Sequence, residues 1–253
     1  MKTKHTAKTL KAFEDWTVDT FNAGKLKSPV HLSGSVDGVQ EKELIEIFKQ
    51  IKPQDWVFTT YRSHYHALLK GVPEQRLKDW ILDNKSIHFM DSEHKVFSSA
   101  IVGGTLPISL GVAMAIKMKK KIDLTNYYGG KITKEDLRDI EVKENQLGHV
   151  YCFIGDTTSY TGMFMECFRY AVEFKLPITF IIENNFLSTD TPTNEVWGIT
   201  KDDMINTFEN FSSKYPDYFK YYTYRRKFPH YGTGKFIDSI WKDLKDNPKA
   251  KGF

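Results

Sequence analysis

Apolar residues form two short runs in the second half of the chain, separated by a stretch with helical spacing. Residues 149–154 are apolar, aromatic and β-branched until Gly155 interrupts them, which is typical of a buried strand in a parallel sheet. A second apolar run spans residues 178–182, directly after Pro177, which cannot continue a helix. Between the runs, the apolar positions with helical spacing are Phe164, Cys167, Phe168, Ala171 and Val172. The pattern predicts a compact strand–helix–strand unit with parallel strands.

A polar residue follows each of the two predicted strands. Asp156 comes after the first strand and Asn185 after the second. Ligands of open α/β sheets bind beyond the carboxyl ends of the strands, so we expect both side chains to project into one crevice. A carboxylate and a carboxamide oxygen suit Mg²⁺, which also accepts phosphate oxygens and water as ligands. Asp and Asn are each common in turns, so neither residue alone indicates a metal site. The strand–helix–strand pattern around them is what favours one.

Residues 155–185 resemble the thiamine diphosphate motif of the alpha chains of the 2-oxo acid dehydrogenase family, which includes the pyruvate and acetoin dehydrogenases. The motif begins Gly-Asp-Gly and ends Asn-Asn, and the chain also has the family's Gly and Glu within the helix, here Gly162 and Glu166. The Lys-Leu-Pro before the second strand is residues 175–177. Thr157 departs from the motif because it replaces a glycine. A β-branched residue does not take a positive φ cheaply, so either the turn differs or the glycine is not needed for its backbone angle.

The resemblance extends upstream in the order in which the family has its motifs. Four segments match: residues 24–40, 59–72, 86–89 and 100–117. The second of these resembles the family's Tyr-Arg-x-His segment and carries two histidines, as in the acetoin type. The resemblance covers most of the chain, about residues 24–119 and 149–198. It implies an α/β fold in which a parallel sheet with helices on both faces binds thiamine diphosphate.

The resemblance also implies a role for each matching residue. Arg62 would present a planar guanidinium to the diphosphate oxygens, and Tyr61 would add a hydroxyl donor; otherwise they are an ordinary surface arginine beside a loop aromatic. The backbone of Ile101, Val102 and Gly103 would meet the aminopyrimidine ring. Thiamine diphosphate and Mg²⁺ are thus the expected cofactors. The other implied binding residues are Gly155, Asp156, Thr157, Thr158, Asn185 and Leu187, of which Asp156, Asn185 and Leu187 would hold the metal.

Two histidines are candidates for proton transfer beside the cofactor. His64 has the matching place in the Tyr-Arg-Ser-His segment. His230 resembles the late active-site histidine of the family, although one extra residue separates it from the preceding Thr-Tyr-Arg strand. We interpret His66 and His88 as partly buried or supporting residues.

The resemblance further predicts a partner chain. Thiamine diphosphate is activated when a carboxyl group protonates its pyrimidine ring, and the family carries that glutamate on a separate beta chain. Neither Glu166, inside the predicted helix, nor Glu183, beside the metal ligands, takes its place. The chain is therefore expected to act on a small 2-oxo acid as the alpha half of an α₂β₂ assembly.

The part of the chain after Asn185 is shorter than in the large dehydrogenase alpha chains, which makes this a shortened member. Service to a lipoyl acyltransferase is therefore in doubt, and a stand-alone carboligase that adds an acyl unit to an aldehyde or sugar is open. A split transketolase-like enzyme and a non-catalytic scaffold chain are further alternatives.

Composition fits one globular domain over residues 1–253, because 40% hydrophobic residues suffice for a sizeable core. An apolar helical run ends at Lys117, and residues 118–147 after it are polar and highly charged; they predict a surface insert with a short helix after Thr133, with docking of the partner chain as the alternative. A net charge of +4 does not favour nucleic acid, and no apolar run approaches a membrane span. Cys152 and Cys167 are expected to be buried thiols, and a cytoplasmic location is expected.

Overall fold

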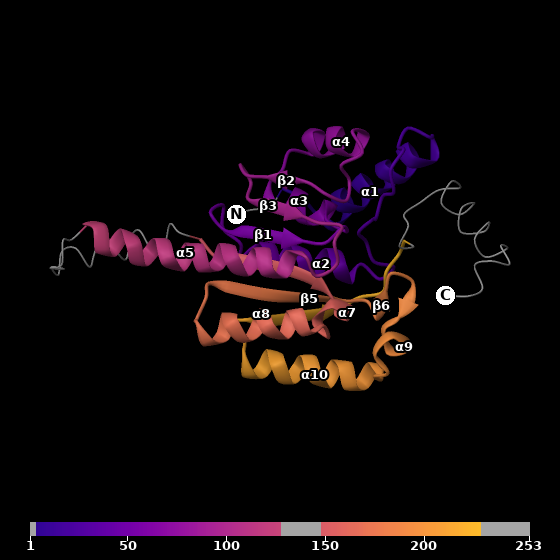
Figure 1. The fold of residues 1–253 in the computed structure, drawn as a ribbon. Helices are drawn as coiled ribbons and strands as arrows, with labels where there is room; N and C mark the ends of the chain where they lie inside the picture. Colours follow the sequence, from indigo (N-terminus) through magenta and orange to yellow (C-terminus); the bar gives the residue numbers. More distant parts are fainter. Residues whose placement is uncertain (1–3, 128–147, 229–253) are drawn as a thin grey trace, which may run out of the picture.

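A six-stranded sheet forms the centre of the protein, for which a computed structural model describes residues 4–127 and 148–228 (Figure 1). The strand order is β2-β3-β1-β4-β5-β8, and β2 runs antiparallel to β3 while the other neighbouring pairs are parallel. The strands are β1 (Trp56–Thr59), β2 (Met90–Asp91), β3 (Val96–Ser98), β4 (Val150–Gly155), β5 (Ile178–Asn184) and β8 (Phe219–Thr223). The predicted α/β fold with a parallel sheet is confirmed.

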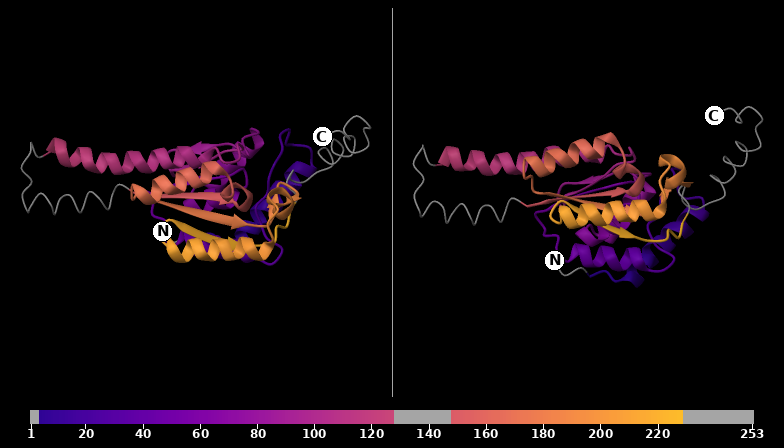
Figure 2. Two further views of the ribbon diagram at one scale, coloured as in Figure 1. Left: turned by 60° about the horizontal axis from the view of Figure 1, so that its bottom comes forward. Right: turned by 90° about the horizontal axis from the view of Figure 1, so that it is seen from below.

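Helices cover both faces of the sheet, and each face has its own apolar core. The helices of the first half pack on one face: α1 (Ala7–Asn22), α2 (Val39–Phe48), α3 (His64–Lys70) and α4 (Glu74–Leu82). The opposite face is covered by α5 (Thr105–Tyr127), α8 (Gly162–Glu173) and α10 (Lys201–Lys214). Figure 2 shows the sheet between α5 and α8 on one side and the helices of the first half on the other. On β5, Ile181 joins the first core while Phe180 and Ile182 join the second, as expected from side chains that alternate between faces.

The predicted strand–helix–strand unit is formed by β4, α8 and β5. The two strands pair in parallel, with Gly155 opposite Glu183 at the end of the ladder. Thr161 caps α8 by accepting a 3.3 Å hydrogen bond from the amide of Phe164. The helix ends at Glu173, before the Lys-Leu-Pro segment.

Three short elements follow the ends of β4 and β5. The first is α7 (Asp156–Ser159), and an antiparallel hairpin of β6 (Leu187–Ser188) and β7 (Thr191–Pro192) leads into α9 (Thr193–Trp197). Thr157 lies within α7 and is not among the residues with positive φ. The glycine that the family motif has at this place is therefore not needed here for its backbone angle.

Helix α5 is longer than the apolar pattern indicated. That pattern ended at Lys117, but the helix continues to Tyr127, into the first part of the predicted insert. The rest of the insert, including the helix expected after Thr133, lies outside the described residues. Within the described ranges, no helix combines the length and apolar character needed to cross a membrane.

The chain order places a switch point between β1 and β4. After β1 the chain moves to β3 on one side, and it then returns to β4 on the other side of β1 and continues outward to β5 and β8. The loops that leave β1 and β4 therefore diverge and open a crevice at the carboxyl ends of the strands, where open α/β sheets bind ligands.

Candidate functional site

A cavity of about 230 Å³ lies at this switch point. Every parallel strand contributes to its wall through the residues at or just after its carboxyl end. Its lining residues are Thr60, Tyr61 and Arg62 after β1; Ala100 and Val102 after β3; Gly155, Asp156, Thr157 and Thr158 after β4; Glu183, Asn185, Leu187, Ser188 and Thr189 from β5 onward; Tyr224 after β8; and His31. Most of the predicted binding residues thus lie around one cavity.

The carboxylate of Asp156 is the most constrained group in the wall. It is 1% exposed, and the backbone amide of Asn185 donates to its Oδ1 at 3.4 Å. The hydroxyl of Thr193 donates to Oδ2. Burial raises the pKa of Asp156 to about 6, and the two hydrogen bonds partly oppose that rise. A cation in the cavity would supply the missing positive partner for this buried acid.

Asn185 and Leu187 lie beside Asp156, on the segment that leaves β5. The side-chain amide of Asn185 donates to the hydroxyl of Tyr224 at 3.1 Å, and its carbonyl oxygen accepts the amide of Leu187 at 2.9 Å. These contacts fix the turn after β5 and link it to Tyr224, which also lines the cavity. The three predicted metal ligands therefore line the same space, and their oxygen donors suit a hard divalent cation.

Arg62 brings a buried positive charge to the opposite wall. Its side chain is 6% exposed, and one terminal nitrogen donates to the carbonyl of Leu32 at 2.9 Å. Burial lowers the pKa of the guanidinium, and nearby Tyr224, Tyr61 and Asp190 partly oppose this shift. Such a fork facing a cavity is suited to an anion with several oxygens, such as a diphosphate. Tyr61, which precedes Arg62 in the chain, packs against the ring of His31, with 4.8 Å between the ring centroids.

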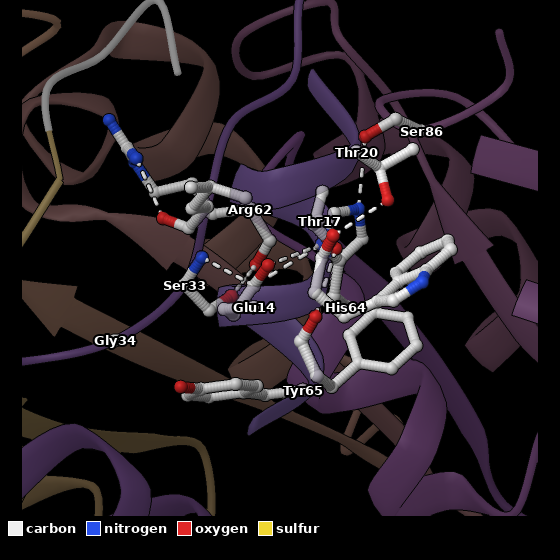
Figure 3. Close-up of polar contacts among 12 residues, drawn as sticks. Glu14, Thr17, Thr20, Ser33, Gly34, Arg62, His64, Tyr65 and Ser86 are labelled. Atoms are coloured by element: carbon white, nitrogen blue, oxygen red, sulfur yellow. Dashed lines mark hydrogen bonds and ion pairs between the residues drawn. The ribbon is translucent and has the colours of Figure 1, made fainter. Parts of the chain in front are cut away.

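His64 does not reach the cavity. Figure 3 shows it in a buried network, where its Nδ1 lies 3.0 Å from Oε2 of Glu14 and its Nε2 lies 2.9 Å from the hydroxyl of Ser86. Glu14 also accepts the amide of Ser33 at 2.8 Å, and the hydroxyl of Ser33 donates to the carbonyl of Arg62 at 3.2 Å. Both ring nitrogens of His64 have polar partners. The network contacts the backbone of Arg62 through the hydrogen bond that Ser33 donates to its carbonyl.

A second buried histidine, His66, lies beside Glu183, which lines the cavity. His66 is fully buried, and its Nε2 is 3.3 Å from Oε1 of Glu183, which also accepts a hydrogen bond from the hydroxyl of Tyr222. The geometry of the histidine contact does not qualify as a hydrogen bond, so the two groups meet as a close polar contact. His66 thus lies against Glu183 without a hydrogen bond, and its role as a supporting residue stays a prediction.

The segment before α5 forms part of the cavity rim. Ile101 and Val102 are 69% and 65% exposed, and Val102 lines the cavity while Ile101 and Gly103 do not. Gly103 has a φ of 76°, a conformation that favours glycine, and a Cβ on Gly104 would lie 3.2 Å from the carbonyl oxygen of Ile101. Two large apolar side chains thus stand in solvent beside the opening.

Sequence reasoning missed several residues of the site. Glu183, Tyr224 and His31 line the cavity, and Thr193 binds Asp156 from outside it. Glu183 and Tyr224 could have been found, because they sit at the carboxyl ends of strands that the pattern already predicted. His31 and Thr193 give no comparable local signal. His230 lies outside the described residues.

The fold and the site together define an open α/β protein with a cavity at the switch point of the sheet, lined by the buried carboxylate of Asp156 and the buried guanidinium of Arg62. The chain belongs to the dehydrogenase E1 component family, whose model matches residues 8–201. Membership of this family implies thiamine diphosphate as the cofactor.

Individual relatives agree with the family. The chain is 30% identical over 183 residues to the pyruvate dehydrogenase E1 component subunit alpha of Porphyra purpurea, a match over 68% of this chain and 47% of that protein. It is 29% identical over 185 residues to the chloroplastic subunit alpha-3 of Arabidopsis thaliana, over 69% and 38% of the two chains. It is 24% identical over 214 residues to the alpha subunit of the acetoin:2,6-dichlorophenolindophenol oxidoreductase of Cupriavidus necator, over 81% and 55%. The matches thus span about half or less of the first two relatives.

Proposed function

We propose that the chain is the cofactor-binding alpha half of a thiamine diphosphate- and Mg²⁺-dependent enzyme that decarboxylates a pyruvate-like 2-oxo acid and transfers the acyl unit. The observation that carries this proposal is the pairing, around one cavity, of a buried carboxylate at Asp156 with a buried guanidinium at Arg62. When bound, thiamine diphosphate would supply the nucleophilic carbon that accepts the acyl group. The residues of this chain would bind and orient its charged end.

Each wall of the cavity would have a distinct task. Arg62 and the hydroxyl of Tyr61 would bind diphosphate oxygens, and Asp156, Asn185 and Leu187 would hold the Mg²⁺ that neutralises them. The networks of Glu14 and His64 would keep Arg62 in place. These tasks are binding and orientation, so the chemical step would need further groups.

A second chain would provide those groups. The cavity of about 230 Å³ is smaller than the ~300–1,000 Å³ of typical ligand pockets, so it suits part of the cofactor. The exposed Ile101 and Val102 stand beside its opening, as expected of a rim that a partner covers. We infer an α₂β₂ assembly whose beta chain contributes the activating glutamate, and a lipoyl acyltransferase or another acceptor for the acyl unit. A cytoplasmic location remains a prediction.

Calorimetry tests the proposal. The tagged full chain, purified with the partner that accompanies it, should bind thiamine diphosphate in the presence of Mg²⁺, and Asp156→Ala should abolish the heat. Asp19→Ala, at an exposed position of α1, is the matched control. The chain without its partner should turn over no pyruvate. Equal binding by the Asp156→Ala complex would favour a scaffold role, and decarboxylation by the isolated chain would refute the division of the site between two chains.

A further inference from the structure

Thr193 connects the Asp156 carboxylate with the segment that follows Asn185. It is the first residue of α9, directly after the β6–β7 hairpin, and it is completely buried. Its hydroxyl donates to Oδ2 of Asp156, 37 residues earlier in the chain. Its backbone amide donates to the carbonyl of Phe186 at 2.9 Å, which closes the hairpin that carries Leu187. Thr193 thus contacts the side chain of Asp156 and also closes the base of the hairpin that carries Leu187, and both Asp156 and Leu187 are predicted metal ligands.

The hydroxyl of Thr193 has a second partner, and the direction of that hydrogen bond follows from proton counting. Its Oγ1 lies 3.0 Å from Oγ1 of Thr157. A hydroxyl has a single proton, and that of Thr193 is already given to Asp156. Thr157 must therefore be the donor, so the protons run from Thr157 to Thr193 to Asp156. In such a chain each bond polarises and strengthens the next.

A third contact closes the arrangement on the exposed side. The indole nitrogen of Trp197, four residues further along α9, donates to the carbonyl of Thr157 at 3.2 Å. Helices α7 and α9 are thus joined by side chains in both directions. This arrangement also gives Thr157, which departs from the family motif, a use for its side chain.

We propose that Thr193 is a positioning residue: with Thr157 it fixes the orientation of the Asp156 carboxylate for a divalent cation and couples that carboxylate to the hairpin carrying Leu187. The inference rests on the proposed function, since it assigns Thr193 to the same cation site. A carboxylate oxygen has more than one acceptor direction, so the hydroxyl and a cation can share Oδ2. Partners that orient metal ligands from outside the coordination shell typically matter about 10–100-fold in metal affinity.

The experiment compares four variants by their affinity for Mn²⁺, a hard oxygen-seeking cation whose free form is counted by electron paramagnetic resonance. The full chain is used with its co-purifying partner and saturating thiamine diphosphate. Thr193→Val should weaken Mn²⁺ binding by about 10–100-fold, and Thr193→Ser, which keeps the hydroxyl, should restore it. Thr191→Val, two residues away on the exposed part of β7, should bind like the wild type. Asp156→Ala should not bind measurably.

The outcomes separate the two proposals. If Asp156→Ala abolishes binding while Thr193→Val stays within about twofold of the wild type, the positioning role is wrong and the proposed function stands. If Asp156→Ala binds like the wild type, the cation site itself is wrong. Should Thr193→Val fail to fold, Thr157→Val provides the test, and a loss intermediate between the wild type and Asp156→Ala is expected because Thr157 acts only through Thr193; unchanged binding would overturn the relay.

Hydrogen exchange of the protein without ligand gives a readout that does not depend on cofactor loading. The amide of Asn185 donates to Asp156, and the amide of Thr193 donates to Phe186. Coupling of the carboxylate to the hairpin predicts faster exchange at both amides in Thr193→Val and no change in Thr191→Val. Acceleration of the Thr193 amide alone, with Asn185 unchanged, would show that the hydroxyl does not reach the carboxylate side and would overturn the coupling.

Discussion

Replacing Asp156 by Asn should stabilise the ligand-free protein, although it should destroy the proposed cation site. The carboxylate is 1% exposed, and burial raises its pKa from the usual 3.8 to about 6. At pH 7 the folded protein therefore carries a buried negative charge whose hydrogen-bond donors among the described residues, the Asn185 amide and the Thr193 hydroxyl, are uncharged. Asn has the same shape without the charge. Its hydrogen bonds can persist, because the hydroxyls of Thr193 and Thr157 can reverse their direction.

The size and sign of the effect follow from proton linkage. The unfolded chain releases the Asp156 proton near pH 3.8 and the folded protein near pH 6, so between these values the folded state binds more protons. The free energy of unfolding of the wild type therefore falls as the pH rises from about 4 to 6. A shift of about 2 pK units corresponds to roughly 3 kcal/mol. The variant lacks this loss, so it should be more stable by about 3 kcal/mol at pH 7 and by about half of that at pH 5.

Urea unfolding of the ligand-free full chain at pH 7 and pH 5 measures this difference. Asp19→Asn, at an exposed position on α1, is the control and should change the free energy of unfolding by less than about 0.5 kcal/mol. Two results would refute the reasoning: an Asp156→Asn variant that is less stable than the wild type at pH 7, or a gain that is equal at both pH values. The first would mean that the charge is already compensated, and the second that the gain has another origin.

Three further predictions concern the packing of the fold and the role of Arg62. Gly148→Ala should lower the free energy of unfolding by about 2–4 kcal/mol, because φ is 81° and a Cβ would lie 2.4 Å from the backbone oxygen of Gln54. Gly111→Ala, where the space inside α5 is open, should raise the free energy of unfolding by up to about 1 kcal/mol. The midpoints of urea unfolding measure both effects. Cys152, with its pKa raised to about 12 by burial, and Cys167, also buried, should react with a thiol reagent at pH 8 only after unfolding, and rapid labelling of the native protein would contradict the packing. Arg62→Met should weaken thiamine diphosphate binding more than Arg62→Lys, because lysine keeps the charge and loses only the two-pronged fork; equal losses in calorimetry would show that the charge by itself contributes nothing.

The sequence was sufficient to predict the elements whose geometry is set by local pattern. Buried parallel strands are short continuous apolar runs, so β4 and β5 could be located, and the direction of parallel strands then dictates that Asp156 and Asn185 emerge at one edge. Arg62 was identified through the family resemblance, and it likewise lies just after a strand, β1. These predictions need no knowledge of the remaining fold, because the sheet fixes where strand ends lie.

Contacts between distant segments could not be predicted in this way. His64 was expected near the cofactor, but α3 directs its side chain toward α1, and its partner Glu14 lies 50 residues away in the chain. The role of Thr193 depends on the β6–β7 hairpin, which brings α9 next to α7. The spacing of apolar residues does not predict this contact. The extension of α5 to Tyr127 passes into a charged stretch that was predicted as a surface insert. For His64 and Thr193, tertiary contacts decided what the local pattern left open.

The switch point between β1 and β4 separates two stretches of the chain that provide all the lining residues of the cavity except His31. Tyr61, Arg62 and Val102 come from residues 60–102, whereas Asp156 and Asn185 come from residues 155–224. The wall with Arg62 and the wall with Asp156 thus come from different stretches of the chain, which meet at the β1–β4 ladder, while the first half of the chain also meets the last strand region at the Ser35–Arg226 bridge. Two polypeptides divided between those stretches would each keep one wall, and both the β1–β4 ladder and the Ser35–Arg226 contact would have to re-form to restore the cavity.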